Sequence, residues 1–69
     1  MQKWEFIFIK VPNVGEISVL NPDGRIEQVP NEPIIVILNK FGADGWELVH
    51  GGVNADSSGF IYTLKRPLA

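Results

Sequence analysis

The chain has 69 residues, no cysteine and a formal net charge of -2, and these properties exclude several classes of protein. A chain this short forms one domain, here residues 1–69, and buries only about 60% of the surface that its unfolded state exposes. Without cysteine it has neither disulfides nor thiolate metal sites, and its acidic balance argues against coating nucleic acid through bulk charge. Self-association is the natural way for such a chain to gain stability.

No segment approaches the ~20 apolar residues that a bilayer span needs. The first residues, Met1 to Glu5, do not combine a basic region with a following apolar run. We therefore expect a cytoplasmic protein with no membrane partner.

Residues 3–11 are rich in β-formers and stop before Pro12, which predicts a first strand. One face of this strand is aromatic: Trp4, Phe6 and Phe8. The other face is mostly aliphatic: Ile7, Ile9 and Val11. A strand that is apolar on both faces exceeds what an open single-layer sheet needs, so we expect the aliphatic face to be covered.

Two short β-forming runs, residues 16–20 and 25–29, flank the sequence Asn21-Pro22-Asp23-Gly24. Proline suits the first central position of a type I turn, and glycine tolerates a positive φ. This pattern predicts a β-hairpin over residues 15–29.

A helix is predicted next, over residues 32–41, with Asn31 as its N-cap. One helical face is apolar at the i, i+3, i+4, i+7 spacing: Ile34, Ile37, Leu38 and Phe41. Gly42 follows and suits the left-handed C′ position. The β-branched residues in 34–38 leave a buried strand as the alternative.

Residues 46–53 predict a strand with Trp46, Leu48 and His50 on one side. A polar turn over residues 54–59 then leads to a closing strand, residues 60–66, whose core-facing side chains are predicted to be Phe60, Tyr62 and Leu64. The predicted fold class is α+β: a small antiparallel sheet with one α-helix packed on one face, plus the hairpin.

Four segments together resemble the domain of unknown function 4177 family of short bacterial and phage proteins. They are Lys3-Trp4-Glu5-Phe6, the glycine-terminated helix, Gly45-Trp46-Glu47-Leu48-Val49 and Tyr62-Thr63-Leu64-Lys65-Arg66-Pro67. The resemblance implies a strand, helix, strand, strand core and no established activity.

The chain departs from that family in two places. The hairpin 15–29 is inserted before the helix, and Ile7 stands where family members often carry a charged residue. Both departures point to partner contacts, although a hairpin folded onto its own sheet is the alternative.

Catalytic chemistry has little support in the sequence. His50 is the one histidine of the chain, the residue type best suited to acid–base catalysis, and it has no cysteine partner. Neither a nucleophile elbow nor a phosphate-binding glycine loop is present. We therefore predict no enzyme, no metal and no cofactor.

Five residues are the candidates for binding an anionic ligand: Arg66, Lys65, Lys10, Arg25 and Trp46. Adjacent strand residues point to opposite faces, so Lys65 and Arg66 cannot line the same groove. Arg66 is the stronger candidate because its planar fork holds a phosphate or carboxylate bidentately. Solvation of strand ends is the alternative for the cations, and a place in the core is the alternative for Trp46.

The function predicted from these features is a non-catalytic interaction module that acts as a homo-oligomer and sequesters an anionic small molecule such as a nucleotide. The predicted interface is aliphatic: Ile7, Ile9, Val11, Ile17 and Val19. A protein–protein adaptor without a small ligand and a nucleic-acid-binding module are the alternatives, the latter disfavoured by charge.

Overall fold

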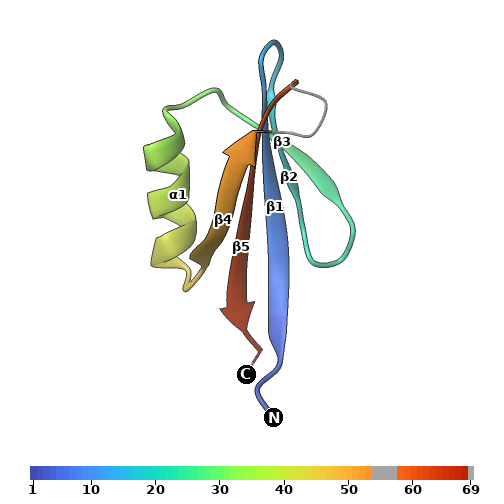
Figure 1. Cartoon of the computed structure of the whole chain (residues 1–69), viewed down its shortest axis with the longest axis vertical. Helices are drawn as coiled ribbons and strands as arrows, with labels where there is room; N and C mark the ends of the chain where they lie inside the picture. The colour runs from blue at the N-terminus through green and yellow to red at the C-terminus, as the bar shows by residue number, and fades with distance from the viewer. Residues whose placement is uncertain (54–57, 69) are drawn as a thin grey trace.

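The computed structural model describes residues 1–53 and 58–68, and every strand in these ranges belongs to one antiparallel sheet. In chain order the elements are β1 (Trp4–Pro12), β2 (Ile17–Leu20), β3 (Ile26–Val29), α1 (Ile34–Ala43), β4 (Glu47–Val53) and β5 (Gly59–Pro67). The strand order is β3-β2-β1-β5-β4, with β1 in the centre (Figure 1). The α+β prediction is confirmed; residues 54–57 of the predicted turn lie outside the described ranges.

Strand β1 organises the sheet because it pairs with a neighbour on each side. Its pairing with β5 runs the whole length of both strands, from Trp4 opposite Pro67 to Pro12 opposite Gly59. On its other side, Phe8 lies opposite Leu20 of β2. Every pairing in the sheet is antiparallel, so the two ends of the described chain lie at the same end of the molecule (Figure 1).

The turn between β2 and β3 forms as its sequence predicts. Gly24 has a φ of 88° and donates its N–H to the Asn21 carbonyl at 2.9 Å. The Asn21 N–H reaches the Arg25 carbonyl at 2.8 Å, and the Arg25 N–H is bound by the Asp23 carboxylate at 3.0 Å. The Asp23 side chain therefore stabilises the turn by accepting a hydrogen bond from the backbone N–H two residues further on.

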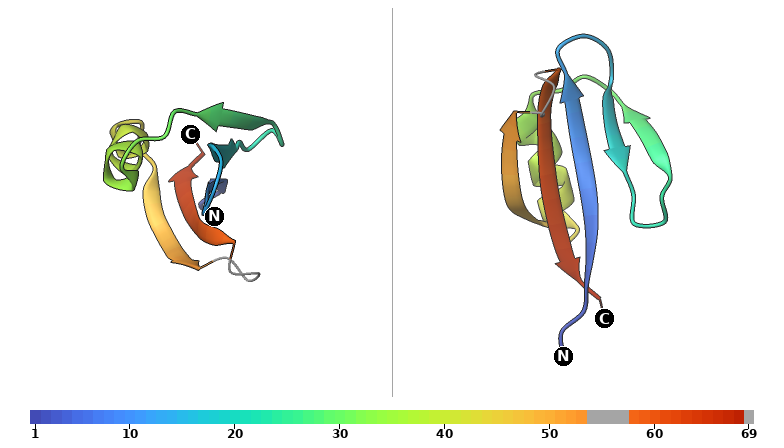
Figure 2. Two further views of the ribbon diagram at one scale, coloured as in Figure 1. Left: turned by 90° about the horizontal axis from the view of Figure 1, so that it is seen from above. Right: turned by 45° about the vertical axis from the view of Figure 1, so that its right-hand side comes forward.

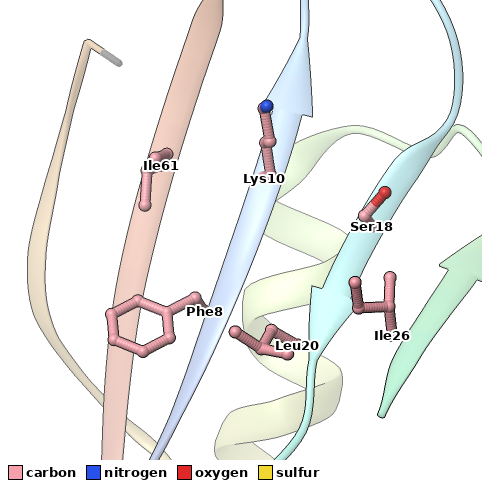
Figure 3. A pocket seen from close by; sticks show the side chains of 6 residues that line it. All are labelled: Phe8, Lys10, Ser18, Leu20, Ile26 and Ile61. Atoms are coloured by element: carbon pink, nitrogen blue, oxygen red, sulfur yellow. The ribbon is translucent and has the colours of Figure 1, made fainter. Parts of the chain in front are cut away.

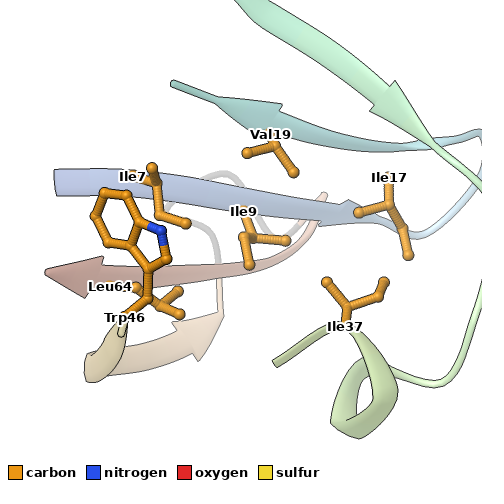
Figure 4. Packing of buried hydrophobic residues seen from close by; sticks show 7 residues of the cluster. All are labelled: Ile7, Ile9, Ile17, Val19, Ile37, Trp46 and Leu64. Atoms are coloured by element: carbon orange, nitrogen blue, oxygen red, sulfur yellow. The ribbon is translucent and has the colours of Figure 1, made fainter. Parts of the chain in front are cut away.

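The sheet is curved, and α1 lies on its inner side (Figure 2). Seven buried side chains form the core there: Ile7, Ile9, Ile17, Val19, Ile37, Trp46 and Leu64. Ile37 is the one member that the helix contributes, and it points at the residues of the sheet (Figure 4). Alternation along β1 brings Ile7 and Ile9 to this inner side.

The predicted interface residues turn out to be this core. Four of the five side chains are at most 4% exposed within the chain itself: Ile7, Ile9, Ile17 and Val19. The fifth, Val11, is half-buried against the same cluster. For the four buried side chains, the assignment to a subunit interface is wrong, because the chain's own helix and strands already exclude them from solvent.

Two side-chain placements on β4 and β5 also differ from the prediction. Leu64 is buried and Tyr62 partly so, but Phe60 is half-exposed at the far end of the sheet, opposite Val11. The register of β4 shifts between Leu48 and His50. Such a bulge adds one residue to a strand, so every side chain after it points to the opposite side of the sheet from the one predicted. Leu48 and His50 therefore lie on opposite sides of the sheet instead of sharing one.

Helix α1 begins at Ile34, two residues later than predicted, and Pro33 is its N-cap. No side chain caps its first turn. Asn31, the predicted cap, lies instead with its amide 3.5 Å from the Gly15 carbonyl. Proline at the helix start fixes φ near the helical value.

The helix ends at Ala43, two residues later than predicted, and its C′ glycine is Gly45 instead of Gly42. Gly42 is helical, whereas Gly45 has a φ of 92°. The Trp46 N–H donates to the Phe41 carbonyl at 3.1 Å, and the Gly45 N–H donates to the Gly42 carbonyl at 3.0 Å. These two bonds make a Schellman motif with glycine at C′ and Trp46 as the apolar residue that follows it.

The two glycines give opposite predictions for alanine substitution. Gly45→Ala places a Cβ in the left-handed region and should cost about 1–2 kcal/mol. Gly42→Ala lies in a helix where an added Cβ meets nothing within 4 Å, so it should stabilise by up to about 1 kcal/mol. Thermal unfolding of the two variants beside the parent measures both effects. A melting temperature that falls for Gly42→Ala and holds for Gly45→Ala would contradict this helix end.

Candidate interaction surface

The side of the sheet away from α1 carries a row of exposed aromatic side chains. We call this side the open face, and we call Trp4, Phe6 and Phe8 the aromatic row. They alternate along β1 with the buried Ile7 and Ile9, and each is between 41% and 45% exposed. Aromatic rings of this size are normally covered, so the row is the most unusual surface in the described part of the chain.

The aromatic row continues sideways into a shallow hollow of about 300 Å³. Its lining comes from four strands: Phe8, Lys10, Ser18, Leu20, Ile26 and Ile61. Register explains the grouping, since Leu20 lies opposite both Phe8 and Ile26 in its neighbouring strands. In Figure 3 these side chains lie in front of the sheet and α1 lies behind it. We call this feature the hollow.

Lysines on the open face differ in what they contact. Lys65 has its Nζ 4.1 Å from the centre of the Trp4 ring and 3.6 Å from a Glu47 carboxylate oxygen. Lys10 stands at the hollow between Ser18 and Ile61 of the flanking strands. Among the described residues no carboxylate forms an ion pair with Lys10. It is thus the uncompensated charge of the hollow.

Arg66 lies on the other face of β5, where it joins the helix end to the sheet. Its Nε and Nη2 donate to Glu5 Oε2 at 3.2 and 3.1 Å, and its Nη1 donates to the Asp44 carbonyl at 3.1 Å. The guanidinium also stacks on Trp46, 4.3 Å from the ring centre. We call this group the Arg66 clamp. Arg66, which was predicted to bind an anionic ligand, thus has a structural role within the chain.

The structure brings three of the five predicted ligand residues to one cavity and leaves two on the open face. Arg25, Trp46 and Arg66 line a cavity of about 420 Å³ on the helix side. Three carboxylates line it as well: Glu5, Asp23 and Glu27. Arg25 is 3.4 Å from Asp23, so both arginines already face an acid. Acids outnumber bases here, which disfavours an anion.

Trp46 is a core residue in this fold, which was the alternative to its predicted role in ligand binding. It is 8% exposed and is covered by Arg66. The aromatic side chains available for stacking are those of the aromatic row. Alternation along β1 correctly placed them on one face, but it did not show that this face is the exposed one. The hollow was not predicted, and its lining residues Leu20, Ile26 and Ile61 were not among the candidate site residues. The signal that finds them is the strand register, which sequence alone does not supply.

The Arg66 clamp predicts a loss of stability when the arginine is removed. Arg66→Met keeps the side-chain stem but leaves the partly buried Glu5 carboxylate without its partner, which should cost about 1–2 kcal/mol. Arg66→Lys should recover little, because lysine has neither the fork nor the planar stack. Urea unfolding measures the change. Lys65→Met is the matched control, because its carboxylate partner Glu47 is exposed whereas Glu5 is not, and it should change stability by less than about 1 kcal/mol; equal losses would contradict the clamp.

Within residues 1–53 and 58–68, no group of three or more His, Asp or Glu side chains is placed to hold a metal ion. In the same ranges, no helix has the length and apolar character that crossing a membrane requires. Comparison with known proteins finds no family model, no curated protein and no solved structure that matches this chain.

Proposed function

We propose that this protein is a non-catalytic interaction module that associates with a second copy of itself through the open face. The aromatic row carries this proposal, because three half-exposed aromatic side chains on the central strand expose apolar surface that the helix does not reach. Burying such surface is the main favourable term in association. A short chain with a small core gains the most from it.

The size of the apolar surface supports a copy-to-copy contact. Aromatic side chains have about 150–250 Å² to bury, so three that are 41–45% exposed still present roughly 200–300 Å². Leu20, Ile26 and Ile61 bring the apolar total to roughly 400 Å². A stable interface buries about 800 Å² per partner with a polar rim. The open face therefore supplies about half of that area from apolar groups alone, a share typical of such interfaces.

The charges of the open face are compatible with packing against a copy. At one end Lys65 is neutralised by Glu47 and rests on the Trp4 ring. Two such faces meet without a run of like charges, which would otherwise oppose association. Lys10 is the exception, because no carboxylate among the described residues neutralises its charge.

We further propose that the module acts in the cytoplasm, that the hairpin is an addition to a core of the 4177 family type, and that its small ligand is anionic. A nucleotide has weaker support than the sequence suggested, because Arg25 and Arg66 each face a carboxylate. A nucleic-acid-binding role has the least support, since the remaining lysines form no stripe. An adaptor without a small ligand stays an alternative.

Self-association through the open face predicts that one charge in the aromatic row abolishes it. Phe6→Glu puts a carboxylate at the middle of the row, where contact with a second copy would leave it desolvated. The parent is expected to show twice the monomer mass by light scattering at micromolar concentration, and the variant the monomer mass.

Ile35→Glu is the matched control, because Ile35 is an exposed apolar residue on α1 rather than on the open face. It should leave the mass unchanged. A parent that stays monomeric, or an Ile35→Glu variant that dissociates as Phe6→Glu does, would argue against the proposal. Circular dichroism of each variant separates dissociation from unfolding.

A further inference from the structure

We propose that the hollow binds a small amphipathic monoanion, of the class of medium-chain carboxylates, with its apolar tail on the floor and its carboxylate at Lys10. This inference deepens the proposed function and rests on it, because a second copy on the open face is what would cover the ligand. Three properties of the hollow carry it: its lining, its single charge and its position.

The lining of the hollow selects an apolar ligand body. Phe8, Leu20, Ile26 and Ile61 form most of it, and only Lys10 and Ser18 bring polar groups. The Ser18 hydroxyl is 3.5 Å from the Gln28 side-chain oxygen, a long contact in which it is the donor. A ligand rich in hydrogen-bonding groups, such as a nucleotide base, would leave those groups unpaired on this floor.

The volume of about 300 Å³ is at the lower limit of small-molecule sites. This size suits a tail of several carbons. It does not suit a dinucleotide or a folded peptide. The tail would contact the same side chains that form the hollow's floor.

The single cation selects the charge of the ligand. Lys10 stands at the hollow with no carboxylate partner among the described residues. Its neighbours across the strands are Ser18 and Ile61, neither of which is charged. A monoanion matches it in charge, whereas a phosphate-rich ligand would bring more negative charge than one lysine compensates.

The position of the hollow connects the ligand to self-association. The hollow lies on the open face and shares Phe8 with the aromatic row. A second copy on this face would surround Lys10 with apolar side chains, and a buried charge without a partner is strongly unfavourable. A bound carboxylate removes that penalty. The anion should therefore bind more tightly to the associated form and favour association in return.

The test is calorimetric titration of the full chain with sodium butyrate, hexanoate and octanoate, and with 1-octanol as the uncharged analogue. Affinity should rise with chain length by up to about fourfold per added methylene. Octanol should bind less tightly than octanoate. Light scattering with and without octanoate reports association in the same samples, and octanoate should raise the associated fraction.

Lys10→Met keeps the length of the side chain and removes its charge, so it should weaken octanoate binding by about two- to fivefold and leave octanol binding unchanged. Lys3→Met is the matched control, because Lys3 precedes β1 and does not line the hollow. Ile26→Thr, at an exposed floor position, should weaken octanoate and octanol alike.

Octanoate binding without chain-length dependence, or equally strong in Lys10→Met, would overturn this inference. An associated parent that binds no carboxylate overturns the inference alone and leaves the proposed function standing. A parent that is monomeric with and without octanoate overturns the proposed function, and with it the role of a second copy in covering the ligand.

Discussion

One helix has to serve a sheet that is apolar on both sides. Five strands about 4.8 Å apart span roughly 19 Å, while α1, with ten residues, is about 15 Å long and about 10 Å wide. It can cover part of one side and none of the other. The inner side therefore receives the core, and the aromatic row is left facing solvent. The proposed self-association and the proposed ligand site both lie on the side of the sheet that the helix cannot cover.

The placement of α1 depends on a small set of contacts at its C-terminal end. The Schellman motif at Gly45 turns the chain directly into β4, and Trp46 enters the core at that point. Arg66 then covers the tryptophan and binds Glu5 on β1. One cation, Arg66, thus joins the end of the helix, the central strand and the last strand. This is why an arginine that the sequence presents as a ligand-binding residue stabilises the fold instead.

The strands, the hairpin turn and the helix were predictable because their periodicity and turn residues agree. The helix end was not, because Gly42 and Gly45 both satisfy the rule for C′, and the choice depends on which one lets Trp46 reach the core. The sequence predicted that the aliphatic face of β1 is covered, but it did not predict that the chain's own helix and strands cover it instead of a second copy. Ile7 and Phe6 are both apolar, and alternation says only that they face apart. The hollow needs the register of four strands, which appears only after folding.

Irregularity in β4 has a consequence for how the sheet ends. This strand forms one edge of the sheet, and it carries a register shift after Leu48 and two glycines, Gly51 and Gly52. A Cβ at Gly51 would lie 2.8 Å from a ring carbon of Tyr62, so the ring occupies the space that a side chain would fill. An edge strand so interrupted presents few backbone groups in line for another strand to pair with. This edge of the sheet thereby resists the strand-by-strand growth that turns exposed edges into fibrils.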